Sequence, residues 1–200
     1  MCRLLETIKV KNGKIYNRSY HEARMTRSRR ELFGTTNKID LSQVKIPGDL
    51  RKNQIYKCRI VYSLTIEEIT FTEYQPKKIR FLQMVRDDHI DYSFKYLDRS
   101  HLQKLKSQAA GVDEIIIVKN GWVTDATYAN LAFFEGKKWL TPSTPLLKGT
   151  KRAFYLDQGI IREAPIRESD VFNFQKVCLI NAMLDIEDGV CVDTQQIHKL

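Results

Sequence analysis

The sequence predicts an α+β fold in two domains, and three observations lead to this prediction. The chain up to Gln75 reads as a β-hairpin, one helix and two further strands. The stretch Gln75-Pro76-Lys77-Lys78 then combines a proline, which cannot continue a central strand, with two charged residues. After it come many short strands and few helices, which favours a curled sheet. We therefore expect a small N-terminal α/β domain over residues 1–76 and a larger β-rich domain over residues 77–200.

The N-terminal elements follow from local signals. An apolar run at Leu4–Val10 and the turn dipeptide Asn12-Gly13 predict a hairpin whose return strand is Lys14–Asn17. Ser19-Tyr20-His21-Glu22 has the capping-box pattern, with Ser three residues before Glu. A helix should therefore start there and run to Phe33-Gly34, where the glycine ends it.

The remaining elements are predicted from hydrophobic spacing and β-branched residues. Two strands complete the first domain, at Gln54–Ser63 and Glu67–Tyr74. Apolar spacing and glycine stops predict helices at Asp98–Ala110 and Gly149–Asp157. The strands expected in the second domain are Ile79–Val85, Glu114–Val118, Trp122–Thr127, Leu131–Phe134, Lys137–Thr141, Ile160–Ile166 and Lys176–Ala182.

The composition excludes several classes of protein. With 42% hydrophobic and 28% charged residues, 9 Gly and 5 Pro in 200 residues, the chain is neither disordered nor low in complexity. No signal-peptide core and no apolar run near 20 residues is present, so we expect a cytoplasmic protein without membrane contact. The four cysteines lack CxxC spacing and are expected to be reduced, and the four histidines lack metal-ligand spacing, so no metal is expected.

The net charge of +9 indicates an anionic partner, which could be nucleic acid, a membrane surface, a phosphate cofactor or an acidic substrate. Nucleic acid is disfavoured, because the basic residues are spread along the chain and no known nucleic-acid-binding motif is present. The densest basic cluster, on the first helix, is read as a solvated helix surface.

Three local patterns could carry chemistry. Lys95 stands between two aromatic residues, and burial would lower the pKa of its amine and free it for Schiff-base formation, although such lysines usually only lay their stems on the rings. Gly149-Thr150-Lys151-Arg152 lies at a predicted helix start, where backbone N–H groups attract anions, although most helix starts bind only water. Asp125 ends a hairpin strand before Asn130, a pattern that is by itself typical of a capped turn.

Taken together in this order, the motifs resemble the class IV aminotransferase family, whose members are pyridoxal-phosphate (PLP) enzymes of fold type IV. The motifs that carry the resemblance are His21-Glu22-Ala23-Arg24, Lys95, Asp125 with Asn130-Leu131, Gly149-Thr150-Lys151-Arg152 and Asn181-Ala182-Met183. The resemblance runs from Leu5-Glu6-Thr7 to about Ile186. It implies a two-domain fold with a pseudo-barrel as the larger domain, and a homodimer.

The resemblance also implies roles for individual residues. Lys95 matches the Schiff-base lysine, and Arg24 matches the arginine that grips the cofactor phosphate. Asp125 matches the acid that faces the pyridine nitrogen, where the family normally has Glu. PLP acts as an electron sink only while that nitrogen stays protonated, which requires an anionic partner.

Further positions match the phosphate side and the substrate side of the family's site. The backbone N–H groups of Thr150 and Lys151 match a phosphate-binding helix start, and Asn181 and Ala182 match a second phosphate-side loop. Arg59 lies on a strand where relatives place a substrate-facing residue, and its guanidinium could hold a carboxylate through two hydrogen bonds.

The implied reaction is that of 4-amino-4-deoxychorismate lyase, which releases p-aminobenzoate and pyruvate for folate biosynthesis. The alternative is an amino-acid transaminase, for branched-chain or D-amino acids, that uses 2-oxoglutarate. The chain begins almost on the Leu4-Leu5-Glu6-Thr7 element, whereas family members usually have an extra strand and loop before it. This shortened N-terminus disfavours an ordinary branched-chain transaminase and leaves a non-catalytic homologue as a third interpretation.

Overall fold

The structure is a computed structural model that describes residues 2–199. The chain divides into two compact units, of which the first holds the residues up to Gln75 together with Phe94–Asp98. The second holds Pro76–Ser93 and the residues from Arg99 onward. The expected domains differ from these units mainly in Phe94–Asp98, which the sequence pattern placed in the second domain.

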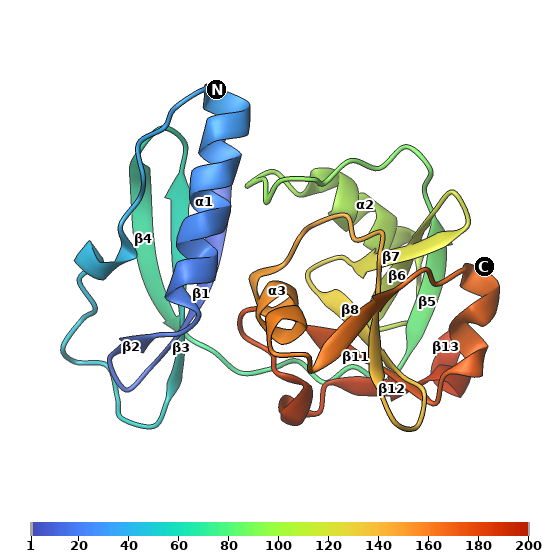
Figure 1. Ribbon diagram of the computed structural model, residues 1–200. Coiled ribbons are helices and arrows are strands. Elements are labelled where there is room, and N and C mark those ends of the chain that lie inside the picture. Colours follow the sequence, from blue (N-terminus) through green and yellow to red (C-terminus); the bar gives the residue numbers. More distant parts are fainter. Residues whose placement is uncertain (1, 200) are drawn as a thin grey trace. The chain divides into compact units, whose positions relative to one another are not determined.

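The first unit is an antiparallel sheet with one long helix lying along it (Figure 1). Its strands are ordered β2-β1-β3-β4, and α1 packs against β1. The elements are β1 (Leu4–Lys11), β2 (Lys14–Ile15), α1 (Arg18–Phe33), the short 3-10 helix η1 (Leu41–Gln43), β3 (Ile55–Tyr62) and β4 (Ile66–Glu73). Buried side chains of β1 and β3, such as Ile8, Cys58 and Ile60, form its core with Met25 of α1.

Of the two predictions made for the ends of α1, the structure confirms one and contradicts the other. Gly34 ends the helix in a left-handed conformation and donates its N–H to Arg30, which confirms the predicted stop. The predicted capping box is wrong, because Asn17 is the N-cap residue and no side chain caps this end. The Glu22 carboxylate is engaged elsewhere: it accepts the backbone N–H of Leu41 at 2.9 Å.

The second unit contains two sheets, ordered β10-β9-β8-β11-β12 and β13-β5-β6-β7. Its strands are β5 (Leu82–Arg86), β6 (Glu114–Lys119), β7 (Trp122–Ala126), β8 (Asn130–Phe134), β9 (Trp139–Pro142), β10 (Ile161–Ala164), β11 (Lys176–Ile180), β12 (Cys191–Asp193) and β13 (Ile197–His198). The helices are α2 (Ser100–Gln108), α3 (Thr150–Asp157) and the 3-10 helices η2 (Glu168–Asn173), η3 (Ile186–Asp188) and η4 (Thr194–Gln196). The architecture is α+β, as predicted, although β12 and β13 were not foreseen because both are very short.

The cysteines correct one expectation. Cys178 of β11 and Cys191 of β12 lie opposite each other in the antiparallel register and form a disulfide, whereas Cys2 and Cys58 are free. The pairing follows from strand register, which cysteine spacing alone does not reveal. Within residues 2–199, none of the helices has the length and apolar character needed to cross a membrane.

Candidate functional site

The residues that sequence analysis singled out fall into two groups, one in each unit. Arg24, Arg59 and Lys95 belong to the first unit. The second unit holds the others, which are Asp125, Thr150, Lys151, Asn181 and Ala182. Each group has its own network of contacts.

The first group is built around Glu6, a fully buried carboxylate on β1 to which sequence analysis gave no role. His21 and Arg24 are three residues apart on α1 and therefore share the face of the helix that packs on the strand. Glu6 Oε1 accepts Arg24 Nε at 2.7 Å, and Glu6 Oε2 accepts Arg24 Nη2 at 2.6 Å. The same Oε2 lies 2.8 Å from His21 Nδ1. An acidic residue directly after two leucines in a predicted strand was the available signal.

These contacts decide the protonation of the cluster. Burial by itself raises the pKa of Glu6, but the charge of Arg24 and the hydrogen bonds from His21 and Arg24 hold that pKa well below its usual range. Burial lowers the pKa of His21 despite the nearby carboxylate. Because an ionised carboxylate only accepts, His21 Nδ1 must donate, and the neutral ring keeps Nε2 as an acceptor. That Nε2 atom is buried and has no hydrogen-bond partner among the described residues.

Lys95 is held against the start of β1 by its main chain. Its carbonyl accepts the N–H of Leu5 at 2.9 Å, and Tyr96 forms a bridge opposite Leu4. The N–H of Tyr96 donates to the carbonyl of Phe94, so Lys95 is the central residue of a three-residue turn. Its positive charge contributes to the lowered pKa of His21. The structure therefore brings Lys95 to the unit that holds Arg24.

Arg59 lies on the other face of the same sheet. Glu6 is opposite Ile60 in the register, so these two side chains share the face beneath α1, and the neighbouring Arg59 points the opposite way. Its guanidinium is about one-third exposed, and its Nη1 lies 3.3 Å from Glu68 Oε1. The sheet thus separates Arg59 from Arg24.

The second group begins with Asp125 at the end of β7. Its side chain is buried, its Oδ1 accepts Asn130 Nδ2 at 2.7 Å, and its Oδ2 accepts the N–H of Leu147 at 2.9 Å. Burial raises the pKa of Asp125 to about 6, although these hydrogen bonds and the charge of Arg152 act in the opposite direction. The carboxyl group is therefore mostly ionised at neutral pH. On acidification it takes up a proton at a higher pH than an exposed aspartate does.

The start of α3 is suited to bind an anion. Gly149 is the N-cap residue and offers no side chain to the first turn, whose N–H groups have no partner within the helix. Thr150 is 4% exposed, and its Oγ1 is buried without a hydrogen-bond partner among the described residues. An unpartnered hydroxyl beside a helix N-terminus is the donor set that a phosphate group requires.

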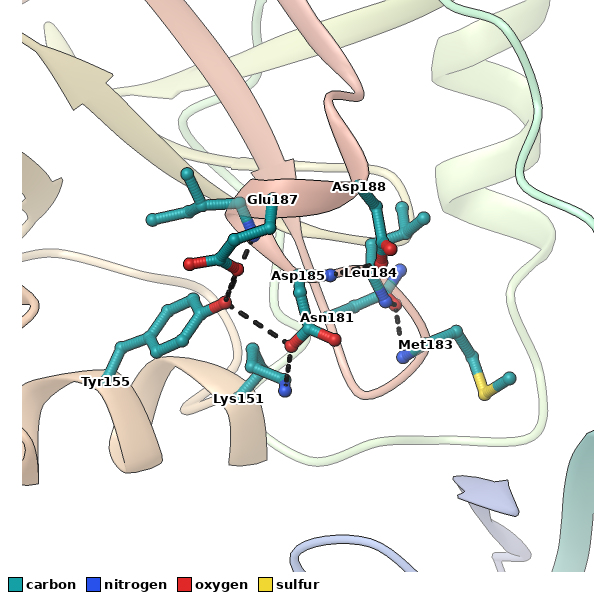
Figure 2. Close-up of polar contacts among 9 residues, drawn as sticks. Lys151, Tyr155, Asn181, Met183, Leu184, Asp185, Glu187 and Asp188 are labelled. Carbon is teal, nitrogen blue, oxygen red and sulfur yellow. Dashed lines mark hydrogen bonds and ion pairs between the residues drawn. The ribbon is translucent and has the colours of Figure 1, made fainter. Parts of the chain in front are cut away.

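The side chain of Lys151 reaches Asp185, the residue before η3 (Figure 2). Its ammonium forms an ion pair with Asp185 and lies 5.3 Å from the ring centre of Tyr155. Tyr155 Oη in turn accepts the N–H of Ile186 at 3.0 Å. Lys151 therefore offers an anion its backbone N–H, while its side chain joins α3 to η3.

Asn181 uses its side chain to build a turn (Figure 2). Its Oδ1 accepts the N–H groups of Met183 and Leu184 at 2.8 and 3.1 Å, and its Nδ2 donates to the carbonyl of Tyr128. Ala182 lies within this turn. Any contact of these two residues with a phosphate would therefore involve the main chain of the turn.

Comparison with known proteins identifies relatives that match between about half and nearly all of the chain. A model of the family described as amino-transferase class IV matches residues 3–187. An uncharacterized protein of Haemophilus influenzae is 44% identical over 188 residues, which are 92% of this chain and 98% of that protein. A proposed aminodeoxychorismate lyase of Schizosaccharomyces pombe is 32% identical over 101 residues, 48% of this chain and 42% of the yeast protein.

Solved structures extend the comparison. The crystal structure of a proposed 4-amino-4-deoxychorismate lyase from Haemophilus somnus superposes with a TM-score of 0.80 at 34% identity, covering 92% of this chain and 97% of that one. A proposed amino-acid aminotransferase from Mesorhizobium loti has a TM-score of 0.79 at 18% identity and covers 100% of both chains, which supports the fold alone.

Proposed function

The chain belongs to the class IV aminotransferase family, and we propose that it is a PLP-dependent 4-amino-4-deoxychorismate lyase. The observation that carries the cofactor assignment is the start of α3, where an uncapped helix N-terminus meets the buried, unpartnered Oγ1 of Thr150. The choice of the lyase reaction rests on the 34% identity with the proposed lyase of Haemophilus somnus. The product p-aminobenzoate would enter folate biosynthesis.

The residues present fit PLP. Its phosphate would be held by the backbone N–H groups of Thr150 and Lys151, the Thr150 hydroxyl, the turn at Asn181-Ala182 and Arg24. Arg24 is held in place by its two hydrogen bonds to Glu6, through Nε and Nη2. Lys95 would attach the cofactor through Nζ. Asp125, with a pKa of about 6, is mostly ionised at pH 7 and would pair with the pyridine nitrogen through its carboxylate.

Bound PLP would supply an electron sink for the reacting carbon. The side chains of this protein would then transfer the protons and stabilise the charges. Lys95 Nζ would act as the base that takes the proton from ring carbon C4 of the substrate, and would assist protonation of the leaving enolpyruvyl group. Asp125 would keep the proton on the pyridine nitrogen. Arg59 faces away from Arg24 and pairs with Glu68, so we give it no role in this scheme. We also propose that the chain is cytoplasmic and forms a homodimer. Light scattering of the purified chain, which measures its molar mass, would test the dimer.

The test uses the purified chain with added PLP. We expect a yellow protein in which borohydride fixes PLP covalently to Lys95, as identified by peptide mass spectrometry. Lys95→Ala should lose both properties, whereas Lys104→Ala, at an exposed lysine of α2, should keep them. A wild-type protein that stays colourless with PLP would contradict the assignment and favour a non-catalytic homologue.

The product separates the two reactions. Incubation with aminodeoxychorismate should release p-aminobenzoate and pyruvate. Formation of glutamate from an amino acid and 2-oxoglutarate, without any p-aminobenzoate, would show a transaminase instead.

A further inference from the structure

Asn130, the first residue of β8, makes more contacts than its predicted role as a turn cap requires. Its side chain is buried, with 6% exposure. Nδ2 donates to Asp125 Oδ1 at 2.7 Å and to the carbonyl oxygen of Leu147 at 2.8 Å. One amide nitrogen therefore bonds both to the carboxylate at the end of β7 and to the loop that leads into α3.

Asp125 closes this arrangement from its other side, because its Oδ2 accepts the N–H of Leu147. The carboxylate, the amide and the main chain of residue 147 thus form a closed ring of three hydrogen bonds. Such a network is rigid when every member is satisfied, since moving one group breaks bonds to both others.

The amide oxygen of Asn130 occupies the space beside Gly149. A Cβ atom added at Gly149 would lie 1.9 Å from Asn130 Oδ1, far inside van der Waals contact. Gly149 has φ −70°, so its conformation suits any residue, and glycine is required here by the close approach alone. Asn130 therefore packs directly against the N-cap residue of α3.

We propose that Asn130 is a positioning residue whose amide holds the Asp125 carboxylate and the start of α3 in one fixed arrangement. The inference rests on the proposed function, in which Asp125 serves the pyridine nitrogen and the start of α3 serves the phosphate. Asn130 touches neither end of the cofactor in this scheme. It sets the spacing between the two groups that do, and pre-positioned groups bind without a further ordering cost.

A purely structural turn cap would have a different signature. Substitution of such a cap lowers stability but leaves the ionisation of Asp125 unchanged. A positioning amide that donates to Asp125 favours its charged form, so its removal should raise the pKa of Asp125. Arg152, which is bonded to Glu163 and the carbonyl of Pro142, is the nearby cation and stays in place.

The experiment measures the pKa of Asp125 by NMR titration of ¹³C-labelled aspartate carboxyl groups, with Asp125→Asn to assign the signal. Asn130→Ser removes the amide directly. Gly149→Ala leaves Asn130 in the sequence but forces its amide away, although Gly149 has no bond to Asp125. Gly48→Ala is the matched control, because a Cβ there meets nothing within 4 Å and the backbone has no positive φ.

We expect Asn130→Ser and Gly149→Ala each to raise the pKa of Asp125 by about one unit, with no change in Gly48→Ala. Titration with PLP, followed by absorbance, should show an affinity at least about tenfold weaker in both variants. If one variant fails to fold, the other still decides the result. An unchanged Asp125 pKa would overturn the positioning role, even in a protein that binds PLP. Wild-type protein that binds no PLP would instead reject the proposed function, while the NMR result would still report on Asn130.

Discussion

Glu6 in the first unit and Asp125 in the second are both buried carboxylates, yet their pKa values move in opposite directions. Burial raises both pKa values, since it penalises the charged form. Glu6 contacts the Arg24 guanidinium through two hydrogen bonds, and its pKa falls well below the usual range. Asp125 accepts only from an amide and from main-chain N–H groups, and its pKa rises to about 6.

A charged partner in direct contact therefore matters more for the ionisation of a buried acid than the number of hydrogen-bond donors does. Two unit charges 4 Å apart interact by about 4 kcal/mol in a partly screened environment, which exceeds the effect of one neutral hydrogen bond. Glu6 is therefore a permanently ionised anchor for Arg24. Among residues 2–199 no cation contacts Asp125 directly, and a protonated pyridine nitrogen would supply one.

The largest effect should come from breaking the Glu6–Arg24 pair. Arg24→Met leaves a buried carboxylate with only His21 as a side-chain partner, and Glu6→Gln leaves the buried guanidinium without a countercharge. Each should lower the free energy of unfolding by about 3–5 kcal/mol, as measured by urea denaturation at pH 7. The double variant should lose less than the sum of the two single losses, because it leaves no unpaired charge. Single losses below about 1 kcal/mol would contradict the view of Glu6 as an anchor.

The second prediction concerns the pH dependence that Asp125 adds to stability. Its pKa rises from 3.8 to about 6 on folding, so its favourable contribution is complete below about pH 4 and is lost as the pH rises to about 6. Relative to Asp125→Asn, wild-type protein should lose about 2–3 kcal/mol between pH 4 and pH 7. Urea denaturation of both proteins across this range measures the difference.

The comparison with Asp125→Asn is needed because His21 acts in the opposite direction. Its lowered pKa makes the folded chain less stable as the pH falls below about 6.5, and this contribution is common to both proteins. A stability difference that stays constant from pH 4 to pH 7 would show that the pKa of Asp125 is not raised.

The smallest effect should come from the Lys151–Asp185 pair, which is an intermediate case. Lys151 is 6% exposed, but Asp185 is 25% exposed and is partly stabilised by water. Asp185→Asn should lower the free energy of unfolding by about 1 kcal/mol at pH 7, again by urea denaturation. Tyr155→Phe is the matched control, since it keeps both charges of the ion pair and removes only the hydroxyl that bonds to Ile186, Glu187 and Asp185. A loss as large as that of Arg24→Met would contradict the dependence on exposure.

The elements that could be predicted are those set by local chemistry. The apolar run at Leu4–Val10 and the Asn12-Gly13 turn predicted the first hairpin, and Gly34 predicted the end of α1 because a left-handed residue there favours glycine. The capping box at Ser19 failed, since the Glu22 carboxylate finds a tertiary partner in the N–H of Leu41. A capping pattern in the sequence fails to form where a distant donor bonds to the same side chain.

The sequence predicted which residues belong to the candidate site, but not which residues their side chains bond to. The motif order identified Arg24, Lys95 and Asp125, but the buried Glu6 that binds Arg24 had no assigned role. Likewise Lys151 was assigned through its backbone N–H, and only the structure shows its side chain paired with Asp185. Such pairings join residues far apart in the sequence, so spacing carries no information about them.

The family, the α+β class and the order of most elements could be inferred from the amino-acid sequence alone, because they follow from short-range periodicity, turn residues and motif order. The tertiary structure decided the packing of Lys95 beside β1, the disulfide between Cys178 and Cys191, and the opposite pKa shifts of Glu6 and Asp125. The physical reason is the same in each case. Register, burial and charge pairing depend on which distant groups come into contact, and folding alone sets those contacts.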